Sequence, residues 1–127
     1  MVSAAHDGYR HLPGRPVHHR SWTLGNCGLR VDDEISGSGR HVVVARWHLA
    51  PGCAVRVRAD GARVSTPAGP VDVDISSTVP ATVALVTARV ATGFGQTGPA
   101  QVLACRVEAS LPVRISTSWS RPAEGAR

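Results

Sequence analysis

Histidine is the residue best suited to acid–base or metal chemistry in this chain, and five of the six histidines lie in the first third of the sequence. A zinc site needs three or four ligands that converge from fixed positions. His18 and His48 are candidates if their strands face each other, with Asp7 or Asp32 nearby, but no H-x-H or H-E-x-x-H spacing supports such a site. Surface or cross-strand histidines are the simpler interpretation, so we expect no metal in this chain.

The segment His6-Asp7-Gly8-Tyr9 is the second place where chemistry is conceivable. A tyrosine beside a histidine can act as general acid and base, but a usable site also needs a group that stabilises the developing charge. Asp-Gly is equally an ordinary turn, with Tyr9 as a partly buried strand residue. We favour the turn.

Arginine supplies every basic side chain other than histidine, with 14 arginines and no lysine. Guanidinium groups bind sulfates and carboxylates through forked hydrogen bonds, so a stripe of arginines would suit an acidic ligand. The members of such a stripe would be Arg20, Arg30, Arg46, Arg56 and Arg58. A solvated outer sheet face is the alternative. No G-x-S-x-G motif occurs, and the glycine-rich residues 93–98 lack the lysine of a phosphate-binding loop.

Composition bounds the class of protein. The 127 residues are enough for one domain with one core, and the net charge of +5 favours acidic partners. Nucleic acid is disfavoured because single strands usually stack on aromatic side chains. The few aromatic residues are Tyr9, Trp22, Trp47, Phe94 and Trp119.

Cysteine usage and hydropathy bear on the compartment. Cys27, Cys53 and Cys105 are odd in number and lack zinc-knuckle spacing, so small buried residues are expected, with a disulfide between two of them left open. No apolar run of about 18 residues predicts a membrane span, and the N-terminus does not read as a signal peptide. A complete chain would be cytoplasmic, whereas a fragment of an exported protein would be periplasmic or secreted.

The candidate residues depend on strands for their positions, and residues 40–52 organise the pattern. Val43, Ala45, Trp47 and Leu49 fall on one face when the stretch is read with period two, which is typical of a strand in a sheet. Pro51-Gly52 ends it. We expect this strand in the middle of the sheet domain, with its alternate face carrying Arg46 and His48.

Similar alternation and turn signals divide the rest of the chain. The expected strands are the first dozen residues, 17–24, 29–35, 54–58, 62–66, 71–75, 81–91, 100–109 and 113–119. Residues 17–24 and 29–35 should form a hairpin, residues 81–91 should be covered on both faces, and residues 92–99 should be a loop. No segment has convincing helical periodicity, so the fold class is all-β, an antiparallel β-sandwich. The domain is expected over residues 1–120, with a polar tail at 121–127.

Three segments resemble one known family. They are HDGYRHLPGRPVHHRSW, LRVDDEISGSGRHVVVARWHLAPG and LPVRISTSW, which are similar in order and spacing to the C-terminal half of the heparinase II/III-like polysaccharide lyases. The resemblance runs from about Ala5 to Trp119, although residues 60–90 match only in strand pattern. It implies a β-sandwich that follows an α/α toroid in a longer lyase.

The resemblance also implies an activity. Such lyases cleave acidic polysaccharides, among them heparin, heparan sulfate and alginate-like uronates, by β-elimination, with catalytic residues in the toroid and at the start of the sheet region. Those positions, and the family's zinc ligands where zinc is present, would precede residue 1. We therefore expect no catalytic residue and no cofactor here, and no lyase activity from this chain alone.

Two functions follow for the chain, an accessory domain of a lyase that partners a toroid domain or chain, or a stand-alone carbohydrate-binding or structural β-sandwich for anionic glycans. Either function would require residues that contact an acidic polysaccharide. The candidate substrate-binding residues are His6, Tyr9, His18, Arg20, Arg46 and His48.

Overall fold

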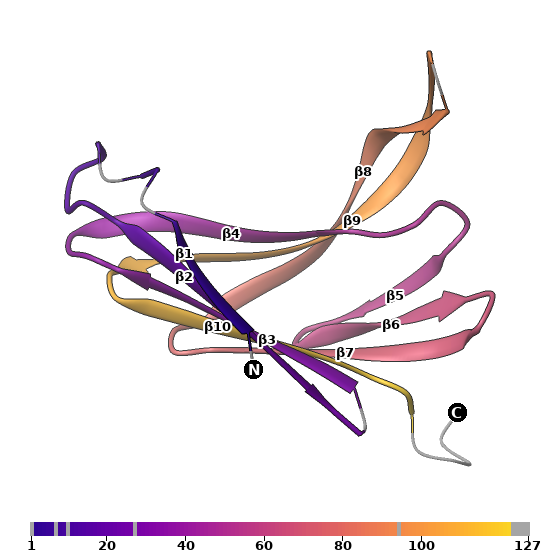
Figure 1. Cartoon of the computed structure of the whole chain (residues 1–127), viewed down its shortest axis with the longest axis horizontal. Coiled ribbons are helices and arrows are strands. Elements are labelled where there is room, and N and C mark those ends of the chain that lie inside the picture. The colour runs from indigo at the N-terminus through magenta and orange to yellow at the C-terminus, as the bar shows by residue number, and fades with distance from the viewer. Residues whose placement is uncertain (1, 7, 10, 27, 94, 123–127) are drawn as a thin grey trace.

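Antiparallel strands make up the architecture of the computed structural model, which describes residues 2–6, 8–9, 11–26, 28–93 and 95–122 (Figure 1). The alternating pattern of the sequence accounts for them, because β-branched residues pack well on a pleated, half-buried surface. The strands are β1 (Val2–His6), β2 (Val17–Gly25), β3 (Gly28–Ser36), β4 (Arg40–His48), β5 (Ala54–Arg58), β6 (Gly61–Thr66), β7 (Gly69–Ser77), β8 (Ala81–Gly93), β9 (Gln96–Ser110) and β10 (Val113–Ser120).

Two sheets of unequal size form a sandwich. The larger has seven strands in the order β1-β2-β3-β10-β7-β6-β5, and the smaller has three in the order β4-β9-β8. All of the pairings are antiparallel, and β2 and β3 form the expected hairpin. Figure 1 shows the β8–β9 hairpin extending beyond the rest of the sandwich. The all-β, antiparallel fold class is thus confirmed.

The core lies between the two sheets. Ile115 of β10, Val73 of β7 and Leu103 of β9 are fully buried, and Cys105 joins the same cluster. Ala45 of β4 belongs to this cluster, while Val43, Trp47 and Leu49 pack against it. The face assigned to the residue 40–52 stretch is therefore correct, since its odd-numbered side chains point inward.

Several expectations about strand position are wrong. β4 lies at the edge of the smaller sheet rather than in the middle, because its only strand partner among the described residues is β9. β8 is not covered on both faces, since Thr82, Ala84 and Val86 are exposed and it too is an edge strand. Residues 92–99 do not form a loop as expected, because β8 runs to Gly93, β9 begins at Gln96, and these two residues pair with each other. Periodicity reports which face is buried but not which strand is outermost.

The first strand is also shorter than expected. β1 ends at His6, and the Leu12 amide donates to the Tyr9 carbonyl at 3.0 Å in a turn. Gly14 then meets the β3–β4 turn: its φ is +82°, and a Cβ there would lie 1.7 Å from the Ser38 carbonyl oxygen. Only glycine allows this approach, which brings the turn containing Tyr9 and Leu12 beside the start of β4.

Candidate functional site

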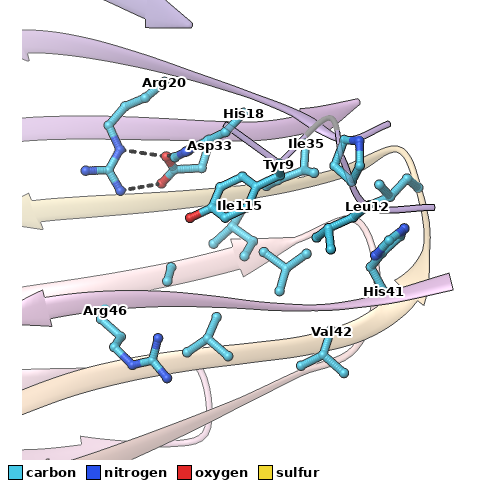
Figure 2. Close-up of a pocket in the computed structure, with 15 residues that line it drawn as sticks. Tyr9, Leu12, His18, Arg20, Asp33, Ile35, His41, Val42, Arg46 and Ile115 are labelled. Atoms are coloured by element: carbon cyan, nitrogen blue, oxygen red, sulfur yellow. Dashed lines mark hydrogen bonds and ion pairs between the residues drawn. The ribbon is translucent and has the colours of Figure 1, made fainter. Parts of the chain in front are cut away.

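A pocket of about 350 Å³ opens between the sheets where the smaller one ends. On one side are β2 and β3 with His18, Arg20 and Asp33, and on the other is the edge strand β4, from which residues 41–46 all line the pocket. Figure 2 shows the Tyr9 ring in the middle of the view, between Asp33 and Ile115, with Leu12 beside His41 at one end and Arg46 directed to the opposite side of β4. The pocket is therefore an inter-sheet groove that runs along β4.

Asp33 is the electrostatic centre of the groove. It is only 2% exposed, and it accepts hydrogen bonds from His18 Nε2 at 2.6 Å, from Arg20 Nε at 2.6 Å and from Arg20 Nη2 at 3.2 Å. Burial by itself raises the pKa of this carboxyl, but the hydrogen bonds and charges of His18 and Arg20 outweigh burial, so the pKa lies below its usual range. Asp33 is an ionised carboxylate that orients both side chains.

Arg20 connects the two sheets. Its guanidinium carbon lies 4.8 Å from the ring centroid of Trp47 on β4 and 6.0 Å from that of Trp22 on β2. Trp47 in turn meets Trp119 of β10 edge to face, with centroids 5.5 Å apart and planes at 75°. This cation, held over the Trp47 indole by a buried carboxylate, connects β2 to β4 at this end of the groove.

The other end of the groove is apolar at its floor and polar at its rim. Ile35, Leu111 and Ile115 are buried along the floor. At the rim, His41 Nε2 donates to the Pro13 carbonyl at 2.6 Å, and Tyr9 is 50% exposed. The apolar floor of this end suits an apolar group.

The six candidate binding residues divide between three places. Tyr9, His18 and Arg20 line the groove. Arg46 also borders the groove, as part of β4, but it is exposed. His48 is exposed further along β4 and is not among the groove residues. His6 pairs with His18 in the β1–β2 register, but its side chain lies outside the described residues, as does Asp7. Whether any of them binds a substrate stays a prediction.

Asp33 and His41 are the groove residues that the sequence reasoning missed. Asp33 carried a signal, because it is the only charged residue in the otherwise apolar set Leu29, Val31 and Ile35 of β3. A carboxylate on a buried strand face demands a cationic partner. His41 carried none, since its role comes from a contact with Pro13, 28 residues away.

The alternative sites find less support. No group of three metal-ligating side chains is present within the described residues, and His18 meets Asp33 rather than Asp32. The arginine stripe is not formed, because its members come from four strands of both sheets, and Arg30 and Arg58 are paired with aspartates.

Two of the three cysteines lie in the part of the chain that the structure describes. Cys53 is half-buried and Cys105 is buried, and both are free thiols, whereas Cys27 lies outside the described residues. Burial raises the pKa of the Cys105 thiol. Where the structure describes the chain, it contains no helix able to span a membrane.

Comparisons with known proteins agree with this fold. Residues 1–127 match the family model described as heparinase II/III-like, C-terminal. Among curated proteins, none matches. Similar solved structures include a heparinase III gene product, with a TM-score of 0.72 at 16% identity, covering 83% of this chain and 17% of that one. Another heparinase III has a TM-score of 0.71 at 16% identity, covering 88% of this chain and 19% of that one. A heparan sulfate lyase from Pedobacter heparinus has a TM-score of 0.67 at 10% identity, covering 84% of this chain and 18% of that one. This chain spans less than a fifth of each.

Proposed function

Because this chain belongs to the heparinase II/III-like family through its C-terminal domain, we propose that it is the C-terminal β-sheet part of a lyase that degrades uronate-containing polysaccharides by β-elimination. The observation that carries the proposal is the match of the family model to all 127 residues. The names of the similar structures, heparinase III and a heparan sulfate lyase, support an acidic glycan as substrate. In this proposal the domain supports a toroid and forms one wall of the glycan cleft.

Arg46 and His48 are the side chains we assign to glycan contact. Both are exposed on the outer face of β4, and Arg46 has no ion-pair partner among the described residues. They lie about 7 Å apart along the strand, since alternate residues share a face. His18 and Arg20 are less suitable, because their charges are directed at the buried Asp33 carboxylate.

The chain alone should have no lyase activity, because the resemblance places the family's catalytic residues in the toroid and at the start of the sheet region, and because His18 and Arg20 of the groove are directed at Asp33. The test measures ultraviolet absorbance of the unsaturated uronate product with heparin, heparan sulfate and alginate. We expect no turnover from the 127-residue protein and turnover when a toroid-bearing protein from the same genome is added. Turnover by the chain alone would contradict the division of labour.

Glycan contact is tested separately on a heparin column. Simple attraction by a net charge of +5 is screened at physiological salt, so retention that survives it reports a binding site. We expect the R46Q/H48Q double variant to elute earlier. R56Q is the control, since Arg56 is also an exposed arginine on a strand, β5, but belongs to the other sheet. An equal loss of column retention in R46Q/H48Q and in R56Q would contradict the assignment of Arg46 and His48. Retention of the wild-type chain on heparin, without lyase activity when the toroid-bearing protein is added, would favour a stand-alone binding domain.

A further inference from the structure

The free edge of β4 is one of four sheet edges without a strand partner among the described residues, and it borders the groove. One edge of this strand pairs with β9, and the other has no strand partner within the described residues. β4 is nine residues long and rich in valine. In native proteins edge strands are usually short, charged or covered, because the unpaired amide and carbonyl groups of a long, exposed edge would pair with further strands.

The groove is the space beside that edge. Six consecutive residues of β4, 41–46, line it, although successive side chains on a strand point to opposite faces. The groove must therefore contact the backbone edge itself, over about 17 Å at the usual rise per residue. Val43 illustrates the consequence: it faces the core, yet it remains only half-buried.

The two sheets of the sandwich also differ in width. The seven-stranded sheet continues past β3 to β2 and β1, whereas the facing sheet stops at β4. The groove occupies that missing position, with an apolar floor of Ile35, Leu111 and Ile115. A polysaccharide chain carrying charges on every repeat gains little from aliphatic side chains, whereas an extended polypeptide offers both backbone hydrogen bonds and inward apolar side chains.

We propose that the β4 edge and the inter-sheet groove accept one further strand, an extended segment with apolar side chains at alternate positions that belongs to the toroid-bearing part of the lyase. The source of the strand rests on the function proposed above. The solved structures that share this fold are more than five times longer than the matched region, so a neighbouring part of the polypeptide is at hand in them. The added strand would extend the three-stranded sheet and cover the groove.

The test uses the 127-residue protein and a synthetic strand, the blocked peptide Glu-Val-Thr-Val-Thr-Val-Glu, followed by amide chemical shifts in NMR. We expect shifts confined to β4 and the groove floor at millimolar peptide. The same peptide N-methylated at its two central residues should not bind, because it cannot pair with an edge. A peptide with the valines replaced by threonine should bind several-fold more weakly, because it leaves the floor uncovered.

Valine-to-threonine variants on two edge strands of the smaller sheet give a matched pair. V43T places a hydroxyl toward the groove and should weaken peptide binding about threefold or more, whereas V86T, at an exposed position of the edge strand β8 outside the groove, should leave peptide binding unchanged. Shifts at the edges β1, β5 or β8 instead of β4, no shift at millimolar peptide, or self-association of the protein through β4 would each overturn the proposal.

The source of the strand needs a second measurement. With the toroid-bearing protein added, hydrogen exchange of residues 41–47 should slow. Lyase turnover without that protection overturns this inference and leaves the proposed function intact. If the peptide binds β4 but no lyase turnover occurs with the toroid-bearing protein, the β4 edge still accepts a strand. The proposed function then fails, and so does the assignment of that strand to the toroid-bearing part of the lyase.

Discussion

Replacing Asp33 by asparagine is the most informative perturbation of the groove, because it removes one charge and almost no volume. Asp33 is 2% exposed and accepts three hydrogen bonds from His18 and Arg20. In the variant, the Arg20 guanidinium stays between the sheets, 4.8 Å from the Trp47 ring centroid, without its counter-charge. An uncompensated cation in a mostly buried site opposes folding.

The expected loss follows from these contacts. Removing one partner of a buried ion pair typically costs about 3–5 kcal/mol. The asparagine amide still accepts one hydrogen bond, and the Arg20 and His18 side chains are each 29% exposed, so water compensates part of the loss. We therefore expect D33N to lower the free energy of unfolding by about 2–4 kcal/mol. For a domain of this size the melting temperature should fall by about 10 °C.

Urea unfolding followed by tryptophan fluorescence measures the loss, and D32N is the control. Asp32 is the preceding residue on the same strand, but it faces the other side of the sheet, where it pairs with Arg30 at 3.1 Å and accepts a hydrogen bond from the Ser116 hydroxyl. Its ion pair is partly exposed, so D32N should cost about 1 kcal/mol or less. Equal losses in D33N and D32N would refute the assignment of Asp33 as the buried anchor of the groove.

Acid provides an independent check with a defined sign. The pKa of Asp33 is lower in the folded protein than its ordinary value, so the stability it contributes is present above its unfolded pKa and is lost as the pH falls through its folded pKa. The difference in unfolding free energy between wild type and D33N should hold above about pH 5 and shrink below about pH 4. A difference that grows on acidification would mean that the sign is wrong.

Three further predictions concern packing. Gly61→Ala should cost about 3 kcal/mol or more, because a Cβ there would lie 1.9 Å from a carbonyl oxygen of β7, whereas Gly52→Ala, at φ +89° with open space around it, should cost about 1–2 kcal/mol; equal losses in urea would argue against the clash. Trp47→Ala should cost about 3–5 kcal/mol and Trp47→Phe clearly less, and thermal unfolding that ranks them equally would exclude a packing role. Iodoacetamide should modify the half-buried Cys53 before the buried Cys105, and peptide mapping that finds equal native rates would contradict the burial of Cys105.

The fold class and the faces of the strands were determined by local sequence. Alternation in residues 40–49 places Ala45 and Trp47 inward and Arg46 outward, and the structure agrees because a pleated strand turns successive side chains to opposite faces. The two alternating segments 17–24 and 29–35, separated by a short turn, likewise predict the β2–β3 hairpin, whose pairing is local. The three motif segments were enough to indicate the family, which the family model confirms.

Tertiary structure alone decided which strands are outermost and which side chains meet. β4 is an edge strand because β9, more than 50 residues later, pairs with only one of its sides, and nothing local encodes that choice. Arg20 meets Trp47 only because two sheets stack. A charged Asp33 on an apolar strand face indicated a buried ion pair, but the cross-strand register decided which residues are its partners. The groove itself arises from a mismatch in sheet width, a property of the assembled layers that no single segment contains.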